Sequence, residues 1–188
     1  IDTLGDWILH TACQKAQNLV SLGWSDLVMA VNISPLQFGR KDFLSKVKNV
    51  LEDTGLEAKN LELEVTEGVI IFNELEAIET LAQLKNLGVH LAIDDFGTGY
   101  SSLSYLRKFN IDKLKIDQSF IQHIQHQAAD QSIVRRNLDL KVIAEGVEEL
   151  EQQEILTAMG CDEIQGFYFS HPLPEQKFID FVKQHRAG

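Results

Sequence analysis

Short apolar runs alternate along this chain with longer stretches in which apolar residues recur every three or four positions. The short runs are typical of buried strands, and the longer stretches are typical of amphipathic helices. Strands are predicted at residues 27–33, 61–65, 89–93, 113–116, 141–144 and 164–169. Helices are predicted at residues 7–22, 42–54, 73–87, 101–109, 131–137, 149–159 and 175–185. The chain therefore alternates strand and helix from end to end.

Strands that are apolar throughout and separated by helices predict an α/β fold, in which helices cover a parallel sheet. Two architectures satisfy this pattern, a doubly wound sheet and a TIM-like (β/α)8 barrel. The Gly-rich turn GxGxxG does not follow the first strand, which argues against a dinucleotide-binding half.

Polar residues recur at the C-terminal ends of the predicted strands and favour the barrel. They are Asn32, Glu64, Asp94, Asp95, Lys115, Glu145 and Gln165. In a barrel these strand ends meet at one mouth, where barrel enzymes hold their chemistry, whereas in an open sheet they lie along an edge. Six strands do not close an eight-stranded barrel, so we expect one or two further strands upstream of Ile1.

The connection between residues 133 and 141 is short. A βαβ crossover with its helix usually takes at least about 10–12 residues, and residues 125–130 are polar and loop-like. Either this crossover is shortened or residues near Arg135 and Arg136 are absent from the sequence.

Length and charge limit the classes of function. The chain has 188 residues, 44% of them hydrophobic, which suffices for one domain with a real core. No apolar run is long enough to cross a membrane, and no signal peptide is evident. The net charge of -11 argues against nonspecific binding of DNA or RNA. The two cysteines, Cys13 and Cys161, predict buried free thiols in a reducing compartment.

Two adjacent aspartates, Asp94 and Asp95, follow the apolar strand 89–93 and precede a loop rich in Gly and hydroxyl residues, 97–102. Neighbouring carboxylates at the end of a buried strand repel each other and lose water. A divalent cation compensates for both effects, and hard oxygen ligands suit Mg²⁺ and Mn²⁺. The alternative is a strand end at which Asp95 caps a helix and Asp94 is solvated.

The other strand-end residues extend this metal hypothesis. Asn32, Glu64 and Glu145 would join the two aspartates as oxygen ligands of two cations, which such sites hold about 3.5–4 Å apart for attack of water on a phosphodiester. Lys115 would position or deprotonate the water or neutralise developing charge. The alternative for Lys115 is an ion pair with Asp117.

Other positions also have structural alternatives. The alternation of Glu62 and Glu64 is interpreted as one carboxylate pointing outward and one inward, and the alternative is an edge strand with both solvated. For Asn32 and Gln165 the alternative is a buried amide that bonds to the backbone.

Several long motifs, in order along the chain, resemble the EAL domains, the cyclic di-GMP phosphodiesterases of bacteria. The motifs are AVNISPLQF (30–38), LELEVTE (61–67), AIDDFGTGYSSLSYL (92–106), LKIDQSF (114–120), VIAEGVE (142–148) and GCDEIQGFYFSHPLP (160–174). The resemblance covers essentially the whole chain, residues 1–188, as a single domain. It implies a barrel with one antiparallel strand, hydrolysis of cyclic di-GMP to linear pGpG, and dependence on Mg²⁺ or Mn²⁺, with two ions expected.

The resemblance also implies roles for individual residues. Metal ligands are Asn32, Glu64, Asp94 as the bridge, Asp95 and Glu145, the last also proposed as a general base. Lys115 corresponds to the lysine close to the attacking water, and Glu67 to the glutamate that anchors the loop 96–102, which would couple closure of the site to dimer contacts. Asn32, Lys115, Gln165 and Glu148 are expected at the substrate, with Glu148 near a guanine.

The sequence departs from the family in two places. The Glu-Ala-Leu signature, which supplies a metal-binding glutamate and a nearby substrate-binding arginine, is not present, and we expect it upstream of Ile1. The family also has about six more residues between Arg135 and Leu138, roughly one and a half helical turns. We predict that both stretches exist in the protein but are not in this sequence.

Three functional hypotheses follow. The first is an active phosphodiesterase, because each motif ligand within the sequence is present and the DDFGTGYSS loop is intact. The second is a receptor or protein-interaction module that binds cyclic di-GMP without cleaving it. The third is a different barrel hydrolase. The resemblance further predicts a homodimer, linked sensory or diguanylate cyclase domains, and a cytoplasmic domain in a soluble or membrane-anchored parent protein.

Overall fold

The computed structural model describes residues 2–72, 74–96, 109–122, 124 and 140–186. In this part of the chain, one sheet contains β1 (Met29–Ile33), β2 (Leu61–Thr66), β3 (His90–Phe96), β4 (Lys113–Ile116), β5 (Lys141–Ala144) and β6 (Glu163–Ile164). The helices are α1 (Asp2–Ser21), α2 (Pro35–Phe38), α3 (Phe43–Thr54), the 3-10 turn η1 (Ala58–Asn60), α4 (Glu67–Phe72), α5 (Glu74–Leu87), α7 (Gln118–Ile121), α9 (Leu150–Met159) and α10 (Glu175–Arg186). The helix predicted at 131–137, nearly all of that at 101–109 and the break near residues 135 and 136 lie outside the described residues.

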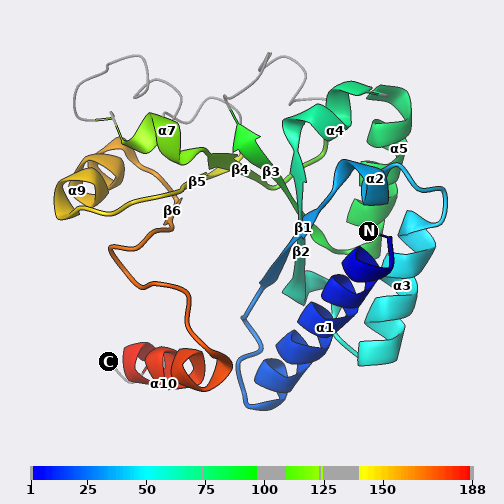
Figure 1. The fold of residues 1–188 in the computed structure, drawn as a ribbon, viewed down its shortest axis with the longest axis horizontal. Coiled ribbons are helices and arrows are strands. Elements are labelled where there is room, and N and C mark those ends of the chain that lie inside the picture. Colours follow the sequence, from blue (N-terminus) through cyan, green and yellow to red (C-terminus); the bar gives the residue numbers. More distant parts are fainter. Residues whose placement is uncertain (1, 73, 97–108, 123, 125–139, 187–188) are drawn as a thin grey trace.

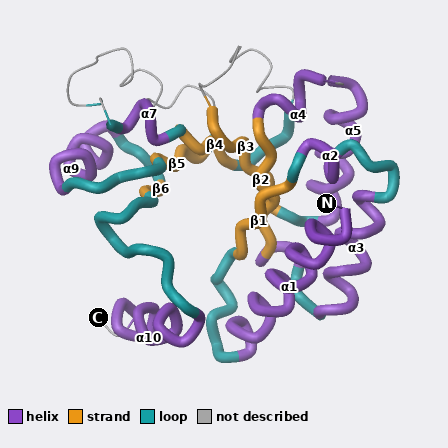
Figure 2. The backbone as a smooth tube through the Cα atoms, viewed as in Figure 1, coloured by secondary structure: helices purple, strands orange, loops and turns teal. Residues whose placement is uncertain are grey.

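Each strand pairs in parallel with the strand that follows it in the chain, so the spatial order is β1-β2-β3-β4-β5-β6. A doubly wound sheet reverses its strand order part-way, and this sheet does not. Right-handed crossovers between successive parallel strands place the helices on one face. Figure 2 shows the result, a curved row of strands with α1, α3, α5 and α9 along its outer side. The predicted α/β fold with a parallel sheet is confirmed, and its order is that of a barrel wall.

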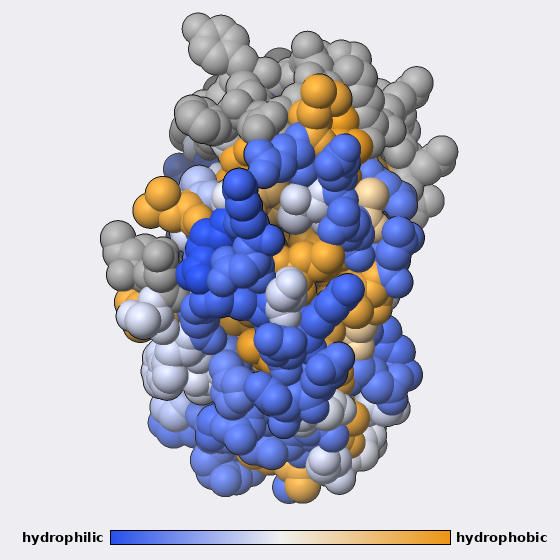
Figure 3. All heavy atoms as spheres, turned by 90° about the vertical axis from the view of Figure 1, so that its right-hand side faces the viewer, coloured by the Kyte–Doolittle hydropathy of each residue, from blue (hydrophilic) through white to orange (hydrophobic). Residues whose placement is uncertain are grey.

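Apolar side chains of the strands point outward into the helical layer. One core cluster joins Leu63 and Leu91 of the sheet with Cys13 of α1, Val47 of α3 and Leu81 of α5, all at most 1% exposed. Apolar burial of this kind stabilises the fold by about 25 cal/mol per Å². The face of the molecule in Figure 3 is largely hydrophilic, with apolar side chains visible as smaller patches.

Glycines follow the C-terminal ends of three outer helices. Gly55 follows α3 and Gly160 follows α9, both in the left-handed conformation that favours glycine, with φ of 70° and 80°. Gly88 follows α5 with φ of 98°. At the other end of α9, Glu149 and Gln152 form a capping box.

The last strand ends at Ile164, so the predicted strand 164–169 is wrong beyond its first residue. The N–H of Gln165 still donates to Ala144 O at 2.9 Å, but the chain then turns, and Phe169 N–H donates to Gly166 O at 3.1 Å. A Cβ at Gly166 would lie 2.0 Å from Val147 O, so the turn packs directly on a neighbouring backbone. The aromatic residues 167–169 are apolar but exposed, which is why apolarity alone misplaced the strand end.

The C-terminal helix returns to the start of the chain. In Figure 1, α10 lies across from the sheet and beside the end of α1. Lys15 of α1 pairs with Glu175 at 2.6 Å, and the rings of Trp24 and Phe178 meet edge to face at 6.4 Å. In the described part of the chain β1 and β6 are the two edges of the sheet and do not pair, so neither barrel closure nor an antiparallel strand is observed.

Both cysteines are free thiols, as expected. Cys13 is fully buried, and burial raises the pKa of its thiol to about 11. Cys161 is only half-buried, so the expectation that both are buried holds for Cys13 alone. Among the described residues, no helix combines the length and apolarity needed to cross a membrane.

Candidate active site

The inner face of the sheet carries charged side chains that are almost fully buried. Glu62 and Glu64 on β2 are 3% and 5% exposed, and Lys115 on β4 is 4% exposed. The prediction that Glu62 points outward while Glu64 points inward is wrong. Residues two apart on a strand share a face, so both glutamates point into the concave side, and neither lies on a solvated edge strand.

Lys115 is the centre of this charged group. Its Nζ lies 2.7 Å from Glu64 Oε2, 3.0 Å from Asp94 Oδ1 and 2.9 Å from Glu145 Oε1. Asp117, the alternative partner for Lys115, instead accepts a hydrogen bond from Ser119 N–H at 3.0 Å and caps α7. Carboxylates from β2, β3 and the end of β5 therefore meet at one ammonium group.

The electrostatics of the group follow from its burial. Burial disfavours the charged form of Lys115, but hydrogen bonds with Glu64 and Glu145 outweigh burial and raise the pKa of the ammonium. Burial also raises the pKa of Glu64 and of Glu145, and the Lys115 charge partly offsets that rise. Three carboxylates surround a single cation, so the site favours additional positive charge.

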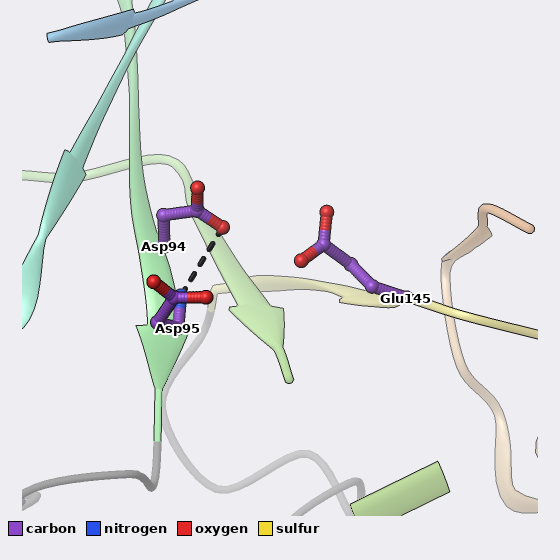
Figure 4. A group of neighbouring side chains, drawn as sticks. All are labelled: Asp94, Asp95 and Glu145. Carbon is purple, nitrogen blue, oxygen red and sulfur yellow. Dashed lines mark hydrogen bonds between the residues drawn. The ribbon is translucent and has the colours of Figure 1, made fainter. Parts of the chain in front are cut away.

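A backbone irregularity brings both aspartates to the same side of the sheet. Successive residues of a regular strand point to opposite faces. Here the pairing of β3 with β4 shifts between Ile93 and Phe96, and Asp95 takes a left-handed conformation with φ of 55°. The N–H of Asp95 donates to Asp94 Oδ1 at 3.1 Å. Such a bulge re-aims a side chain, and both carboxylates turn toward Glu145 (Figure 4).

Asp94, Asp95 and Glu145 form a set of donors suited to a metal ion. One carboxylate oxygen from each lies within 4.8 Å of the other two. Partial loss of water raises the pKa of Asp95, and the charges of Asp94 and Asp117 raise it further. Closely spaced carboxylates that repel each other are the oxygen ligands that Mg²⁺, Mn²⁺ and Ca²⁺ accept. These residues therefore fit a divalent cation.

The structure also describes the other residues predicted for the site: Asn32, Glu67, Gln165 and Glu148. Asn32 is directly in register with Glu64 on the adjoining strand, with an exposed side chain. Glu67 is the first residue of α4 and is half-buried, but the loop that it is predicted to anchor lies beyond residue 96, outside the described residues. Gln165 follows β6 and is exposed, and neither it nor Asn32 is a buried amide.

Glu148 is exposed, and its N–H donates to Gln152 Oε1 at 2.9 Å, which places it at the start of α9. Sequence reasoning missed two residues of the inner face, Lys113 and Ala92. The alternating pattern of Lys113 and Lys115 on one strand was a signal for the first, because alternate residues share a face.

Comparison with known proteins places this geometry in a family. The family model described as EAL domain matches residues 1–172 of the 188. The chain belongs to the EAL domain family. The matched range includes the strand ends that bear the carboxylates.

Curated relatives of this EAL domain are larger proteins. The cyclic di-GMP phosphodiesterase NbdA of Pseudomonas aeruginosa is 43% identical over 192 residues, which cover 99% of this chain and 24% of NbdA. The uncharacterized protein y4lL of Sinorhizobium fredii is 45% identical over 97% of this chain and 22% of its own length. The chain spans about a quarter of the length of these relatives.

Solved structures share the fold. The PaMucR phosphodiesterase in complex with c-di-GMP is 41% identical, with a TM-score of 0.89, over 94% of this chain and 74% of that one. A manganese and cyclic di-GMP complex of Klebsiella pneumoniae BlrP1 is 34% identical, with a TM-score of 0.75, over 85% of this chain and 42% of that one. At these identities the EAL fold of this chain is well supported.

Proposed function

We propose that this EAL domain hydrolyses cyclic di-GMP to linear pGpG with the help of divalent cations. The observation that carries the proposal is the meeting of Glu64, Asp94 and Glu145 at Lys115, with Asp95 turned toward the same point. NbdA is named as a cyclic di-GMP phosphodiesterase, and PaMucR is described in complex with that dinucleotide, which supports the same substrate here.

The proposed ligands of two cations, Mg²⁺ or Mn²⁺, are Asn32, Glu64, Asp94, Asp95 and Glu145, with Asp94 shared between the ions. When bound, such ions neutralise a phosphodiester and lower the pKa of a water that attacks it in line. The BlrP1 complex with manganese and cyclic di-GMP supports the use of a divalent cation by this fold.

Lys115 acts as a charged donor in this proposal. The raised pKa keeps its ammonium protonated, so it positions the attacking water and stabilises negative charge on the phosphoryl oxygens, rather than removing a proton. Glu145 accepts the proton of the water. The water oxygen bonds to phosphorus, the bond from phosphorus to the ribose 3′-oxygen breaks, and that oxygen takes up a proton to give pGpG.

The outer residues serve the substrate and the loop. Gln165 and Glu148, both exposed near the ends of β6 and β5, line the substrate site, with Glu148 near a guanine. Asn32 and Lys115 also contact the substrate. Glu67 anchors the loop that follows β3. We further propose that residues 1–188 belong to one cytoplasmic domain that acts as a homodimer. The greater length of the relatives supports the proposal that this domain is linked to sensory or diguanylate cyclase domains.

The direct test is turnover of cyclic di-GMP by the purified protein with Mg²⁺, with Mn²⁺ and with EDTA, while binding of the dinucleotide is measured in parallel. Metal-dependent formation of pGpG is the expected result. Tight binding with no product under any metal would overturn the catalytic proposal and make the protein a receptor. Binding of neither dinucleotide nor metal would overturn both.

A further inference from the structure

A second layer of buried charge lies beneath the carboxylates of the candidate active site. Lys113 Nζ lies 3.0 Å from Glu62 Oε2 and 2.9 Å from Glu163 Oε2. The Lys113 side chain is only 14% exposed and Glu62 only 3%. Lys113 donates a hydrogen bond to Glu163, whereas its contact with Glu62 Oε2 is an ion pair without hydrogen-bond geometry. Burial disfavours the charge on Lys113, but the two carboxylates outweigh burial and raise the pKa of the ammonium. None of these three residues belongs to the proposed catalytic or metal-binding group.

The two layers are built in the same way. Lys113 and Lys115 are two residues apart on β4, and Glu62 and Glu64 are two apart on β2, so each lysine reaches a glutamate on the far side of β3. Ala92 of β3 is in register with Glu64 on one side and with Lys113 on the other. The small side chain of Ala92 leaves room for the side chains of Lys113 and Lys115 to pass over β3 and reach the glutamates of β2.

The ion pairs of Lys113 connect strands that are not neighbours in the sheet. Glu62 lies on β2, Lys113 on β4 and Glu163 on β6, so one ammonium links three strands that do not pair with one another. Glu62 is followed two residues later by Glu64, and Glu163 is followed two residues later by Gln165. The ion pairs therefore hold β2 and β4 two residues before Glu64 and Lys115, and β6 two residues before Gln165.

We propose that Lys113 is a positioning residue for the phosphodiesterase reaction: it holds Glu64, through Glu62, at the distance from Lys115 and Asp94 that the chemistry requires. This inference rests on the proposed function. A buried ion pair contributes little net stability compared with an apolar pair of similar volume, whereas loss of one partner is strongly destabilising. The function of the pair is thus geometric, and stability and position can be separated by experiment.

The separating variants are Lys113→Met alone and Lys113→Met combined with Glu62→Gln. The single variant leaves Glu62 as an uncompensated buried charge, so both the melting temperature and kcat fall. The double variant removes that charge, so the melting temperature recovers toward wild type. Because the ion pair of Lys113 and Glu62 then no longer ties β2 to β4 beside the Lys115–Glu64 pair, kcat stays about 10- to 100-fold low, and Mn²⁺ affinity falls by a similar factor.

Two further variants provide controls. Lys113→Arg keeps a cation between the two glutamates and restores most of the lost kcat. Lys141 lies on β5 in register with Lys113, its side chain is 65% exposed, and its Nζ is 3.8 Å from Glu163 Oε1. Lys141→Met leaves kcat and Mn²⁺ affinity unchanged. If the double variant regains wild-type kcat together with its melting temperature, Lys113 is merely structural and the proposal fails.

Mn²⁺ binding, measured by isothermal titration calorimetry, separates this inference from the proposed function. A wild-type protein that binds Mn²⁺ but forms no pGpG overturns the phosphodiesterase assignment, and with it the catalytic role of Lys113. In that case a loss of Mn²⁺ affinity in the double variant, with none in Lys141→Met, still assigns Lys113 to the positioning of the metal ligands. Equal Mn²⁺ affinity in all variants overturns the inference whatever the wild-type activity.

Discussion

Lys115 and Glu64 form an ion pair across an intervening strand, with 2.7 Å between Nζ and Oε2 although β3 separates β4 from β2. The lysine side chain thus crosses the face of β3 to reach its partner. This arrangement requires β3 to present a small residue between the two strands, and Ala92, fully buried, is in register with Glu64.

Replacement of Ala92 by leucine is expected to separate the two charges. Overpacking of a well-packed interior costs about 1–3 kcal/mol, and the larger side chain lies where the lysines cross. We expect a lower melting temperature and at least a tenfold loss of kcat, the approximate effect of disturbing residues that orient metal ligands. Ala92→Gly, which keeps the passage open, is the control and should retain more activity than the leucine variant. A leucine variant with wild-type turnover would show that the crossing is not tightly packed.

Removal of Lys115 is expected to lower the melting temperature more in the absence of metal than in its presence. Lys115→Ala leaves three carboxylates without their shared cation, and loss of one partner of a buried ion pair costs about 3–5 kcal/mol. Added Mn²⁺ should replace part of the lost charge, so the rise in melting temperature on adding Mn²⁺ should be larger in the variant than in wild type. Turnover should fall by orders of magnitude while Mn²⁺ binding persists. A variant whose Mn²⁺ affinity and turnover vanish together would contradict the assigned role.

Neutralisation of Asp94 should affect metal binding and rate together. Asp94→Asn removes charge from the residue proposed to be shared by two cations, so Mn²⁺ affinity should fall and kcat should fall by several orders of magnitude. The matched control is Asp53→Asn, which makes the same charge change on the exposed side of α3. Calorimetric Mn²⁺ titration and pGpG formation would be measured on both variants, and equal effects would contradict a local role for Asp94.

The glycine after Glu145 provides a test of backbone position. Gly146 has φ of 71°, and a Cβ there would lie 2.4 Å from Gln118 Cβ. Gly146→Ala must therefore move the segment that carries Glu145 away from α7, and kcat should fall at least tenfold, as for loss of a supporting contact at a metal site. Gly55 has nearly the same φ, 70°, but nothing within 4 Å of the added Cβ. Gly55→Ala should lower the melting temperature through backbone strain of about 1–2 kcal/mol and leave kcat unchanged.

Alkaline pH should destabilise the fold through Cys13. Burial raises the pKa of this thiol to about 11 in the folded protein, against about 8.5 in an unfolded chain. Below the unfolded value both states keep the proton and the folded state retains its full stability; as pH rises toward 11, only the unfolded state gains from ionisation. The free energy of unfolding should fall over this window, and the fall should be smaller in Cys13→Ala. Thiol reagents at pH 8 should label Cys161 before Cys13.

The sequence was sufficient to predict the strand–helix alternation, the parallel sheet and the residues at the strand ends. These follow from local signals, because burial on both faces makes a strand apolar throughout. The sequence was not sufficient to predict contacts between side chains on two strands that are separated by a third strand. The partnership of Lys113 with Glu62 is of this kind, since alternation shows which face a residue occupies but not which residue it meets.

The extent of β6 could not be read from apolarity either. Residues 167–169 look like a strand in the sequence, but the backbone turns at Gly166, where packing against Val147 leaves no room for a side chain. The common orientation of Asp94 and Asp95 likewise depends on one left-handed residue within β3. Such single-residue departures carry no periodic signal, although here they shape the candidate active site.

The sequential order of the strands has a consequence for how this domain folds. Because every strand pairs with its neighbour in the chain, the sheet can grow one unit at a time, and contacts between near neighbours in sequence favour rapid folding. The carboxylates at Lys115, however, come from β2, β3 and the end of β5. A nascent chain that has formed β1, β2 and β3 has no complete site, because the last ligand arrives only with Glu145. The proposed phosphodiesterase site is therefore completed late in the growth of the chain, and a partly made protein lacks it.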